Sequence, residues 1–452
     1  MEEHSIQISF VKKIEKLVDK NKRNKIQRLL ADIHPADIAD ILDQLPPEKA
    51  ATVFKLLPIE TASEVLDETG SLVRRELLDT VDEEMLADLL DELPMDDAAE
   101  FLEDLDNKQA DRLIELMEPE DRAEVEELLS YEEDTAGRLM TRTVVTLRRF
   151  WTVDETLAHL RHLKEAETLH YLYAVDVEDK LLGVVPLRNL VLSPAEATIE
   201  SIMREDVVAV LVTADQETLA EMVARYDYYS IPVVDENGRF LGVVTVDDVL
   251  DIVAEEATED IQRLGGSEPL DQPYFAVSTL QMVKKRIGWL FLLFIASTLT
   301  GTVLNAFQHE LEVVITLSLF IPLIIGTGGN AGSQTVATII RAITLDEVRL
   351  SNVFHAVRKE MAVGLLLGIT MMGIGFVRAI TWDTGFDIAI VVGITLTAVV
   401  LWAMMVATVV PIVADRFNVD PAVISGPMIT TVVDATGLLI YFSLAKLILE
   451  SI

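Results

Sequence analysis

The sequence predicts an α-helical membrane protein with five transmembrane helices, preceded by a cytosolic α-helical solenoid and a pair of α/β domains. Three observations lead to this prediction: five long apolar segments late in the chain, an early helical repeat at a spacing of 48 residues, and a second repeat of about 60 residues between them. The predicted division is 1–132 for an acidic helical superhelix, 137–260 for the α/β pair, 261–286 for a linker helix and 287–452 for the transmembrane domain.

The net charge of −38 is concentrated before the membrane segments. Residues 1–270 contain 63 acidic and 27 basic residues, whereas residues 271–452 contain 12 and 10. Such an acidic field repels nucleic acid and concentrates cations, so we expect no nucleic-acid partner. The absence of cysteine excludes disulfides and fits a cytoplasmic location. The first residues lack a basic stretch followed by an apolar core, so no cleaved signal peptide is expected.

A solenoid of short helices is predicted from the first repeat. The segment Ala39–Pro46, which reads ADILDQLP, recurs as Ala87–Pro94, which reads ADLLDELP. Apolar residues such as Ile38, Ile41 and Leu42 fall on one helical face, and each Leu-Pro pair ends a helix. The acids between them form a solvated face or, alternatively, meet acids of the following domain around a cation.

The second repeat predicts two α/β units, each with the order strand, helix, strand, glycine turn, strand, helix. Leu139–Thr141 recurs as Ile202–Arg204, and Leu182–Leu190 recurs as Leu241–Val249. In this stretch the sequence resembles a tandem pair of CBS domains. The resemblance implies two modules that fold as a pseudo-dimer and often sense nucleotides or ions.

The same resemblance implies one cleft for an adenine nucleotide such as ATP. The family commonly uses a Ser or Thr followed three positions later by an Asp, and only the second unit has this pair, as Thr245 and Asp248. The first unit has Leu187 and Asn189 near the equivalent places. Residues that would line the cleft by resemblance are Tyr171, Arg188, Asn189 and Tyr228. A core role for the two tyrosines is the alternative.

An acidic helix is predicted just before the membrane domain. Seven acids lie within fourteen residues, namely Asp247, Asp248, Asp251, Glu255, Glu256, Glu259 and Asp260. Spacings of three and four place like charges on common faces, where they repel. Mg²⁺ or Ca²⁺ would suit these carboxylates better than soft metals, although a solvated acidic helix is the alternative. After a break at Leu264-Gly265-Gly266, residues 274–287 can form the linker helix into the first span.

Five apolar segments are each long enough to span a bilayer. They are residues 287–307, 313–339, 361–381, 388–413 and 423–449. Basic residues flank alternate connections, and the loops after the first and third spans hold only Arg378, so the N-terminus is expected in the cytoplasm and the C-terminus outside. A closed, water-lined path is easier to build between two copies than within five helices, which favours a symmetric homodimer.

Two polar strings interrupt the apolar segments. Pro322–Gln334 contains four glycines and two amides, so unwound backbone is expected there, either buried in protein or lining a wet cavity. Glycines that simply allow close helix packing are the alternative. Asp420–Asp434 reads DPAVISGPMITTVVD. An ionisable group at the depth of Asp434 costs about 2.5 to 3.5 kcal/mol on insertion scales, so it is typical of an ion path or proton relay. A carboxylate that pins helices together, or a protonated acid, is the alternative.

Taken together, the acidic solenoid, the CBS pair, the five spans and the GxGGNxGxQ and SGPxxTTxxD strings resemble the MgtE family of Mg²⁺ channels. The resemblance implies a homodimer in the cytoplasmic membrane with a Mg²⁺ pore along the dimer axis. Asp434 matches the ion-coordinating aspartate of the family, and Gly426, Thr430 and Asn330 are expected to contribute to the pore. Some members carry asparagine where this chain has Gly426. Since Mg²⁺ sheds water reluctantly, few direct metal bonds are expected.

The resemblance also implies a sensor for cytosolic Mg²⁺ at the acidic junction. The implied sensor residues are Asp91, Asp215, Asp227, Asp248, Asp251, Glu256, Glu259 and Asp260. Abundant Mg²⁺ would bridge these acids and hold the pore shut, whereas scarce Mg²⁺ would let them repel one another and release the linker helices.

Other functional classes fit less well. A secondary transporter that couples H⁺ or Na⁺ to a divalent cation would use the same Asp434 as a titrating carrier, and it stays open as the alternative. An anion transporter is disfavoured because the spans carry no interior arginine or lysine besides Lys446. An enzyme is not expected, since no HExxH, GxSxG or P-loop pattern occurs.

Overall fold

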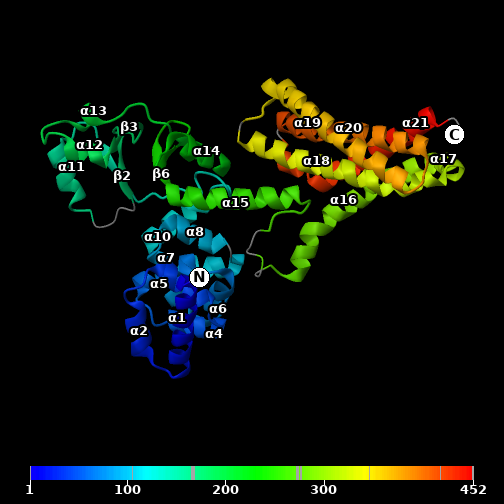
Figure 1. Ribbon diagram of the computed structural model, residues 1–452. Coiled ribbons are helices and arrows are strands. Elements are labelled where there is room, and N and C mark those ends of the chain that lie inside the picture. The colour runs from blue at the N-terminus through cyan, green and yellow to red at the C-terminus, as the bar shows by residue number, and fades with distance from the viewer. Residues whose placement is uncertain are drawn as a thin grey trace. The chain divides into compact units, whose positions relative to one another are not determined.

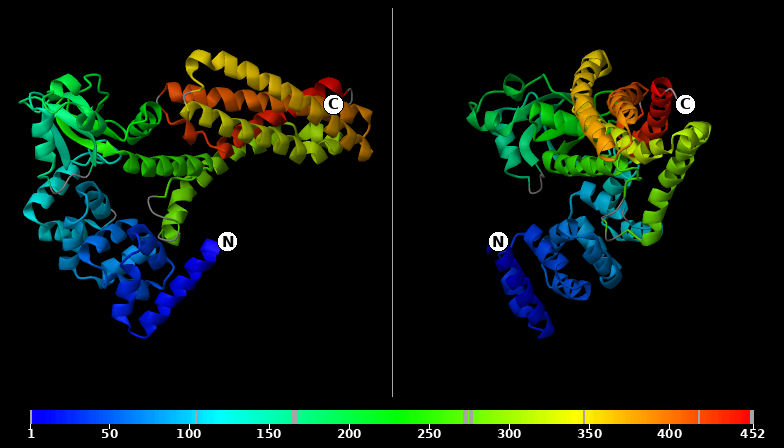
Figure 2. Two further views of the ribbon diagram at one scale, coloured as in Figure 1. Left: turned by 60° about the vertical axis from the view of Figure 1, so that its left-hand side comes forward. Right: turned by 45° about the vertical axis from the view of Figure 1, so that its right-hand side comes forward.

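The computed structural model describes residues 2–103, 105–163, 168–270, 274, 277–345, 347–417 and 419–449. The chain forms two compact units, Met1–Glu256 and Ala257–Ile452, which are described separately (Figures 1 and 2). The boundary between them falls within helix α15, Val246–Leu264.

The first unit begins with the predicted solenoid of short helices (Figure 1). Its helices are α1 Glu2–Asp19, α2 Arg23–Leu30, α3 Pro35–Asp43, α4 Pro47–Phe54, α5 Ile59–Glu68, α6 Ser71–Thr80, α7 Glu83–Asp91, α8 Met95–Glu103, α9 Asn107–Leu116 and α10 Pro119–Leu128. The Leu-Pro pairs act as predicted, because α3 and α7 each end just before such a pair. Side chains of one face, such as Ile38, Leu42, Leu86 and Leu90, are fully buried.

The two α/β units follow the predicted order of strands and helices. They comprise β1 Val144–Arg148, α11 Val153–Leu160, β2 Thr168–Val175, β3 Leu181–Pro186, α12 Leu187–Leu192, α13 Ile199–Ile202, β4 Val210–Leu211, α14 Gln216–Tyr226, β5 Ser230–Val234 and β6 Phe240–Thr245. Two three-stranded sheets have the orders β1-β2-β3 and β4-β5-β6, each with one parallel and one antiparallel pair. A hydrogen bond of 2.9 Å joins Tyr173 Oη on β2 to Ser230 Oγ on β5. This buried contact links the first α/β unit to the second.

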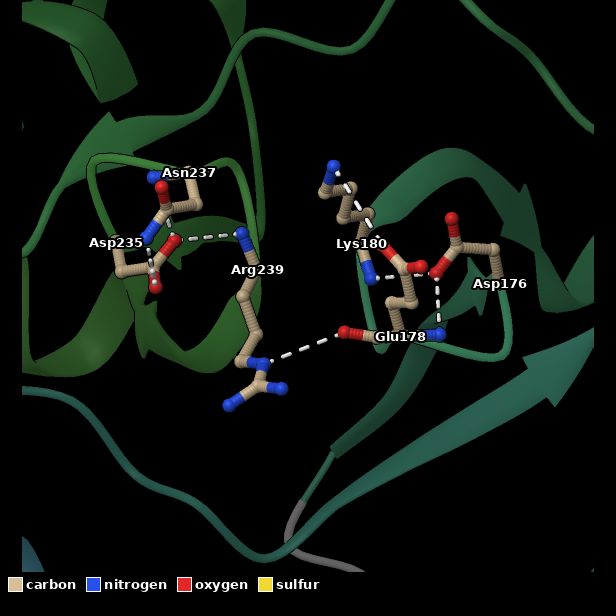
Figure 3. A network of polar contacts seen from close by, with 6 residues as sticks. All are labelled: Asp176, Glu178, Lys180, Asp235, Asn237 and Arg239. Atoms are coloured by element: carbon tan, nitrogen blue, oxygen red, sulfur yellow. Dashed lines mark hydrogen bonds and ion pairs between the residues drawn. The ribbon is translucent and has the colours of Figure 1, made fainter.

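The two hairpins of these sheets contain matching aspartate turns (Figure 3). Asp176 Oδ1 accepts hydrogen bonds from the backbone N–H groups of Glu178 and Lys180 at 2.8 and 2.9 Å. In the second hairpin, Asp235 Oδ1 accepts equivalent bonds from Asn237 and Arg239, both at 2.8 Å. Backbone N–H donors lower the pKa of both aspartates, since they stabilise the charged form.

The hairpins differ in the residue that takes the left-handed conformation. The second turn uses Gly238, with φ of 78°, as the predicted glycine turn requires. The first turn has Asp179 at φ 61° instead, so the expected glycine is absent there. The side chain of Arg239 reaches across from one hairpin to the other and donates through Nε to the carbonyl of Glu178 at 3.2 Å (Figure 3).

Within the residues that the structure describes, the second unit contains five helical segments long and apolar enough to span a membrane, as predicted. Its elements after α15 are α16 Thr279–Ala306, α17 Gln308–Val313, η1 Ile315–Phe320, α18 Ile321–Thr344, η2 Leu350–Asn352, α19 Val353–Thr381, α20 Phe386–Arg416, η3 Pro421–Val423 and α21 Gly426–Ile448. Helix α20 packs against α18, α19 and α21, while α16 packs against α21 (Figures 1 and 2). The predicted linker helix has no boundary with the first span, since α16 runs from a capping box at Ser278 to Ala306 without interruption.

The expectation of unwound backbone at Pro322–Gln334 is wrong, because α18 is α-helical throughout this string. Its glycines instead allow close packing against α21. A Cβ atom added at Gly329 would lie 2.7 Å from Thr430 Cγ2, and one at Gly332 would lie 2.9 Å from Ile429 Cγ2. Small residues let helix backbones approach closely in membranes, which explains these glycines without a break in the helix.

The second polar string does interrupt the helices. The chain leaves α20, forms the 3₁₀ turn η3 at Pro421–Val423, and enters α21 at Gly426. Ser425 is fully buried and caps α21 by accepting a hydrogen bond from the N–H of Met428. The string therefore places the first turn of α21 at a defined point beside α18.

Replacing Gly329 with alanine is expected to destabilise the membrane unit. The added methyl group overlaps Thr430, and overpacking of this kind costs about 1–3 kcal/mol. Thermal unfolding of the full-length protein in detergent should show a midpoint lower by several degrees. Gly373→Ala on α19, where the added Cβ meets nothing within 4 Å, is the control and should match the original protein or exceed it. Equal midpoints for both variants would contradict the close approach of α18 and α21.

Candidate cation pathway and carboxylate cluster

Asp434 lies on α21 inside the membrane unit. Its side chain is half-buried, and within the described part of the chain its buried Oδ1 atom has no hydrogen-bond partner. A buried polar atom without a partner is costly, so such an atom in a folded protein calls for an explanation. An acceptor oxygen that is not satisfied by protein donors is free to accept a cation or its water.

Hydroxyl groups lie one turn before this carboxylate. Thr430 Oγ1 donates to the carbonyl oxygen of Gly426 at 2.8 Å, and Ser333 Oγ on α18 lies 3.1 Å from Thr430 Oγ1. Because the single proton of Thr430 is used on Gly426, Ser333 is the donor in the second bond. The structure thus brings the predicted residues Gly426 and Thr430 together and adds Ser333 to them. The sequence could have indicated Ser333, because this residue lies within the first polar string, Pro322–Gln334.

A polar stripe runs along the exposed side of α18. Asn330, Gln334 and Thr338 follow one another at intervals of four residues and are all exposed in the single chain. Residues with this spacing share one face of a helix. Polar groups at membrane depth are stabilised by water or by other polar groups, so this stripe calls for a polar environment. Asn330, predicted for the pore, directly follows Gly329, which packs against Thr430.

Glu259 and Asp420 are joined through one guanidinium group. Arg263 on α15 forms ion pairs with both carboxylates. Asp420 also accepts a hydrogen bond from the N–H of Ala422 at 2.8 Å, which caps the turn η3. The predicted sensor residue Glu259 therefore has a basic partner in this structure. Asp260, the next predicted residue, lies beside it on α15.

Three carboxylates converge in the first unit. One oxygen each of Asp96, Asp97 and Asp248 lies within 4.8 Å of the others. Asp248 is held in place by Thr245, which donates to it through both its N–H, at 3.1 Å, and its hydroxyl group. Burial raises the pKa of Asp248, and the hydrogen bonds from Thr245 partly oppose this shift. Oxygen atoms so placed suit a hard divalent cation.

The predicted sensor set contained Asp248 but not Asp96 or Asp97. The repeat held a usable signal, because these two acids occupy the places of Glu48 and Lys49 in the first copy. Lys49 forms ion pairs at 2.8 and 3.0 Å with acids of α1. Its replacement by Asp97 in the second copy exchanges a paired base for another acid.

Two further acids near this cluster also have raised pKa values. Burial is the main cause for Asp251 and for Asp67, and the charges of Asp251 and Asp248 add to the shift at Asp67. Asp91 lies on α7 outside the three-carboxylate group, and its oxygens accept from the N–H of Glu118 at 3.2 Å. Burial raises the pKa of Asp91 to about 6.

The remaining predicted sensor residues lie on or beside α14. Asp215 caps its N-terminus by accepting from the N–H of Glu217 at 2.9 Å, whereas Asp227 ends the helix with a left-handed φ of 55°. Glu256 accepts a hydrogen bond of 2.7 Å from Gln216 Nε2. The structure thus brings Glu256 close to the Asp215 end of α14 and separates both from Asp227 by the length of the helix.

Two of the predicted nucleotide residues, Tyr171 and Tyr228, belong to one aromatic group. The ring of Tyr171 lies 6.4 Å from that of Tyr228 and 6.3 Å from that of Tyr229. Tyr171 pairs with Pro186, directly before α12, which carries Arg188 and Asn189. Tyr171 and Tyr228 are half-buried, and Tyr173 is the core tyrosine of this region. Burial raises the pKa of Tyr171.

Comparison with protein families matches all three parts of the chain. Residues 321–444 match the MgtE model, described as a divalent cation transporter. Residues 33–134 match the MgtE intracellular N domain, and residues 136–196 and 199–255 each match the CBS domain.

Similar proteins and structures agree with these matches. The magnesium transporter MgtE of Thermus thermophilus is 42% identical over 335 residues, which cover 74% of each chain, and that of Enterococcus faecalis is 34% identical over 333 residues, or 73% of each. A crystal structure of the cytosolic domain of the Mg²⁺ channel MgtE in complex with ATP has a TM-score of 0.51 and 39% identity, covering 54% of this chain and 99% of that one. The soluble part of a magnesium transporter has a TM-score of 0.52 and 29% identity, covering 56% and 99%.

These relatives are named as transporters and not as enzymes, which confirms the prediction that the chain is not an enzyme. They also confirm the architecture of a helical N domain, a CBS pair and membrane helices. On the strength of these matches, the chain belongs to the MgtE family of divalent cation transporters.

Proposed function

We propose that two copies of this chain form a Mg²⁺-selective channel that admits Mg²⁺ across the cytoplasmic membrane. The observation that carries the proposal is the buried, unpartnered oxygen of Asp434 within a spanning helix. A carboxylate in this position attracts cations, and the names of the relatives make Mg²⁺ the transported ion.

The path is proposed to hold Mg²⁺ with most of its water. Mg²⁺ is small and dehydrates reluctantly, so protein groups bind its water shell more readily than the bare ion. Asp434 would supply charge, while Asn330, the carbonyl oxygen of Gly426 and the hydroxyl of Thr430 would accept or donate to bound water. The same arrangement in a second copy doubles the charge around the path.

Pairing of two copies is supported by the polar stripe on α18. Asn330, Gln334 and Thr338 are exposed in the single chain although the helix is long and apolar enough to span a membrane. A second copy that meets this face would enclose the stripe around water and remove it from lipid. In this arrangement the N-terminal domains lie in the cytosol and the C-terminus lies outside.

Regulation is proposed to act through the carboxylate cluster. A Mg²⁺ ion between Asp96, Asp97 and Asp248 would join α8 to the start of α15 and favour a closed state. Loss of the ion leaves like charges within 4.8 Å of one another, which favours separation. An adenine nucleotide, such as ATP, is proposed to bind at the cleft near Tyr171 and Tyr228 and to modulate this equilibrium.

Asp434→Asn tests the path directly. The amide keeps the size of the side chain but removes its charge, so Mg²⁺ currents through the full-length protein in a planar bilayer should fall by at least about tenfold. Asp383→Asn, an exposed acid just after α19, should conduct normally. Mg²⁺ currents as large as those of the unaltered protein, measured for a folded, dimeric Asp434→Asn variant, would disprove a cation path at Asp434. Silence of the unaltered protein, with vesicle uptake that needs a proton or Na⁺ gradient, would establish the coupled carrier instead.

Asp97→Asn tests the regulatory cluster. Hydrogen exchange of peptides from α8 and the start of α15, measured in the full-length protein, should slow as Mg²⁺ is added. The variant should need at least about tenfold more Mg²⁺ for half of this effect, since one charged ligand is lost. Asp111→Asn, an exposed acid on α9, serves as the control and should leave the midpoint unchanged. An unchanged midpoint for Asp97→Asn would exclude a cation at the cluster.

Asp91→Asn tests the raised pKa of Asp91. Its pKa is about 6 in the folded protein against an ordinary value of 3.8, so folding favours the protonated form. This contribution to stability is fully present below 3.8 and is lost as the pH rises through about 6. Without divalent cations, the unfolding midpoint of the original protein should therefore fall relative to Asp91→Asn between pH 5 and 7. A constant difference across this range would contradict the shift.

A further inference from the structure

A small apolar groove opens between three helices of the membrane unit. Its volume is about 240 Å³. The lining residues are Leu323 of α18, Met371, Ile374, Gly375 and Arg378 of α19, and Leu396 of α20. All but Arg378 lack a polar side chain, and Ile374 is 57% exposed, so the groove is open to the surroundings of the helices.

The groove has one charged residue, and it lies at one end. Arg378 is in the last turn of α19, three residues before the helix ends. Its guanidinium group stacks over the ring of Trp382, with 4.3 Å from Cζ to the ring centroid. Trp382 is 43% exposed, as is typical of aromatic residues at a membrane interface. Within the described residues, no carboxylate lies within ion-pair distance of Arg378.

The dimensions of the groove match part of one lipid leaflet. Met371 and Arg378 are seven residues apart on a continuous helix, which corresponds to about 10 Å along its axis. The apolar core of a bilayer is about 30 Å thick, so a groove of this length lies within one leaflet. Its apolar part therefore faces acyl chains, while Arg378 and Trp382 lie near the level of the headgroups.

We propose that this groove binds an anionic phospholipid, with an acyl chain along Ile374 and Leu396 and its phosphate at Arg378. Guanidinium groups bind phosphate oxygens in a bidentate manner, and the cation–π contact with Trp382 holds the group in position without neutralising its charge. The sequence supplies no second base beside it, since Arg378 is the one Lys or Arg between Lys359 and Arg416. This inference is independent of the proposed pore and of its ion.

Native mass spectrometry of the full-length protein tests the proposal. The protein is equilibrated with equal amounts of phosphatidylglycerol and phosphatidylcholine that carry the same acyl chains, and the retained lipids are counted. We expect phosphatidylglycerol to be enriched about fivefold, the size expected for one basic side chain near an anionic headgroup. Arg378→Gln should remove this enrichment, whereas Arg378→Lys should retain part of it and shows that the site still folds.

Two further variants make the outcome specific. Arg416→Gln removes an exposed base at the end of α20 and should leave the enrichment unchanged. Ile374→Trp adds bulk in the groove and should reduce retention of both lipids. Equal retention of the two lipids by the original protein would overturn the proposal. The same enrichment in the Arg378→Gln variant would also overturn it. Lipid retention that Ile374→Trp does not change would overturn it as well, and this result is expected if a second copy of the chain covers the groove.

Discussion

The gathering of carboxylates in partly buried places is the constraint on which the rest of this structure depends. Glu310 is only 7% exposed and lies 3.1 Å from Lys446, so its charge is matched within the unit. Asp434 differs, because its buried Oδ1 atom has no hydrogen-bond partner in the described chain. In the first unit, one oxygen each of Asp96, Asp97 and Asp248 lies within 4.8 Å of the others. Both arrangements become favourable once a cation is present.

The scaffold holds these carboxylates through local rules that the sequence makes visible. Leu-Pro pairs keep the solenoid helices short, so α8 begins at Met95 and presents two acids in its first turn. Thr245 fixes Asp248 by a side-chain and a backbone hydrogen bond at the start of α15. In the membrane unit, glycines bring α18 against α21, and a buried serine cap sets the first turn of the helix that carries Asp434. Rigid elements therefore define where charge accumulates.

Periodicity and composition could predict the fold and the isolated charge, because both are properties of contiguous segments. The five spans, the two repeats and the position of Asp434 follow from hydropathy and spacing alone. What sequence could not supply were contacts between distant segments. Asp96 and Asp97 meet Asp248 across about 150 residues of sequence, and Glu259 is neutralised by an arginine that also binds Asp420. The prediction of unwound backbone at Pro322–Gln334 was wrong because a glycine-rich sequence suits close helix packing as well as unwinding.

The unbroken course of α16 has a mechanical consequence. A helix of 28 residues is about 42 Å long, which exceeds the apolar thickness of a bilayer by roughly 12 Å. The excess carries Lys284, Lys285 and Arg286, which suit the headgroup region. Ser278 caps the same continuous helix that is long enough to cross the membrane. A force applied at the Ser278 end therefore meets no break in the helix before the membrane segment. A continuous helix of this length would carry a tilt imposed at one membrane surface through to the other surface.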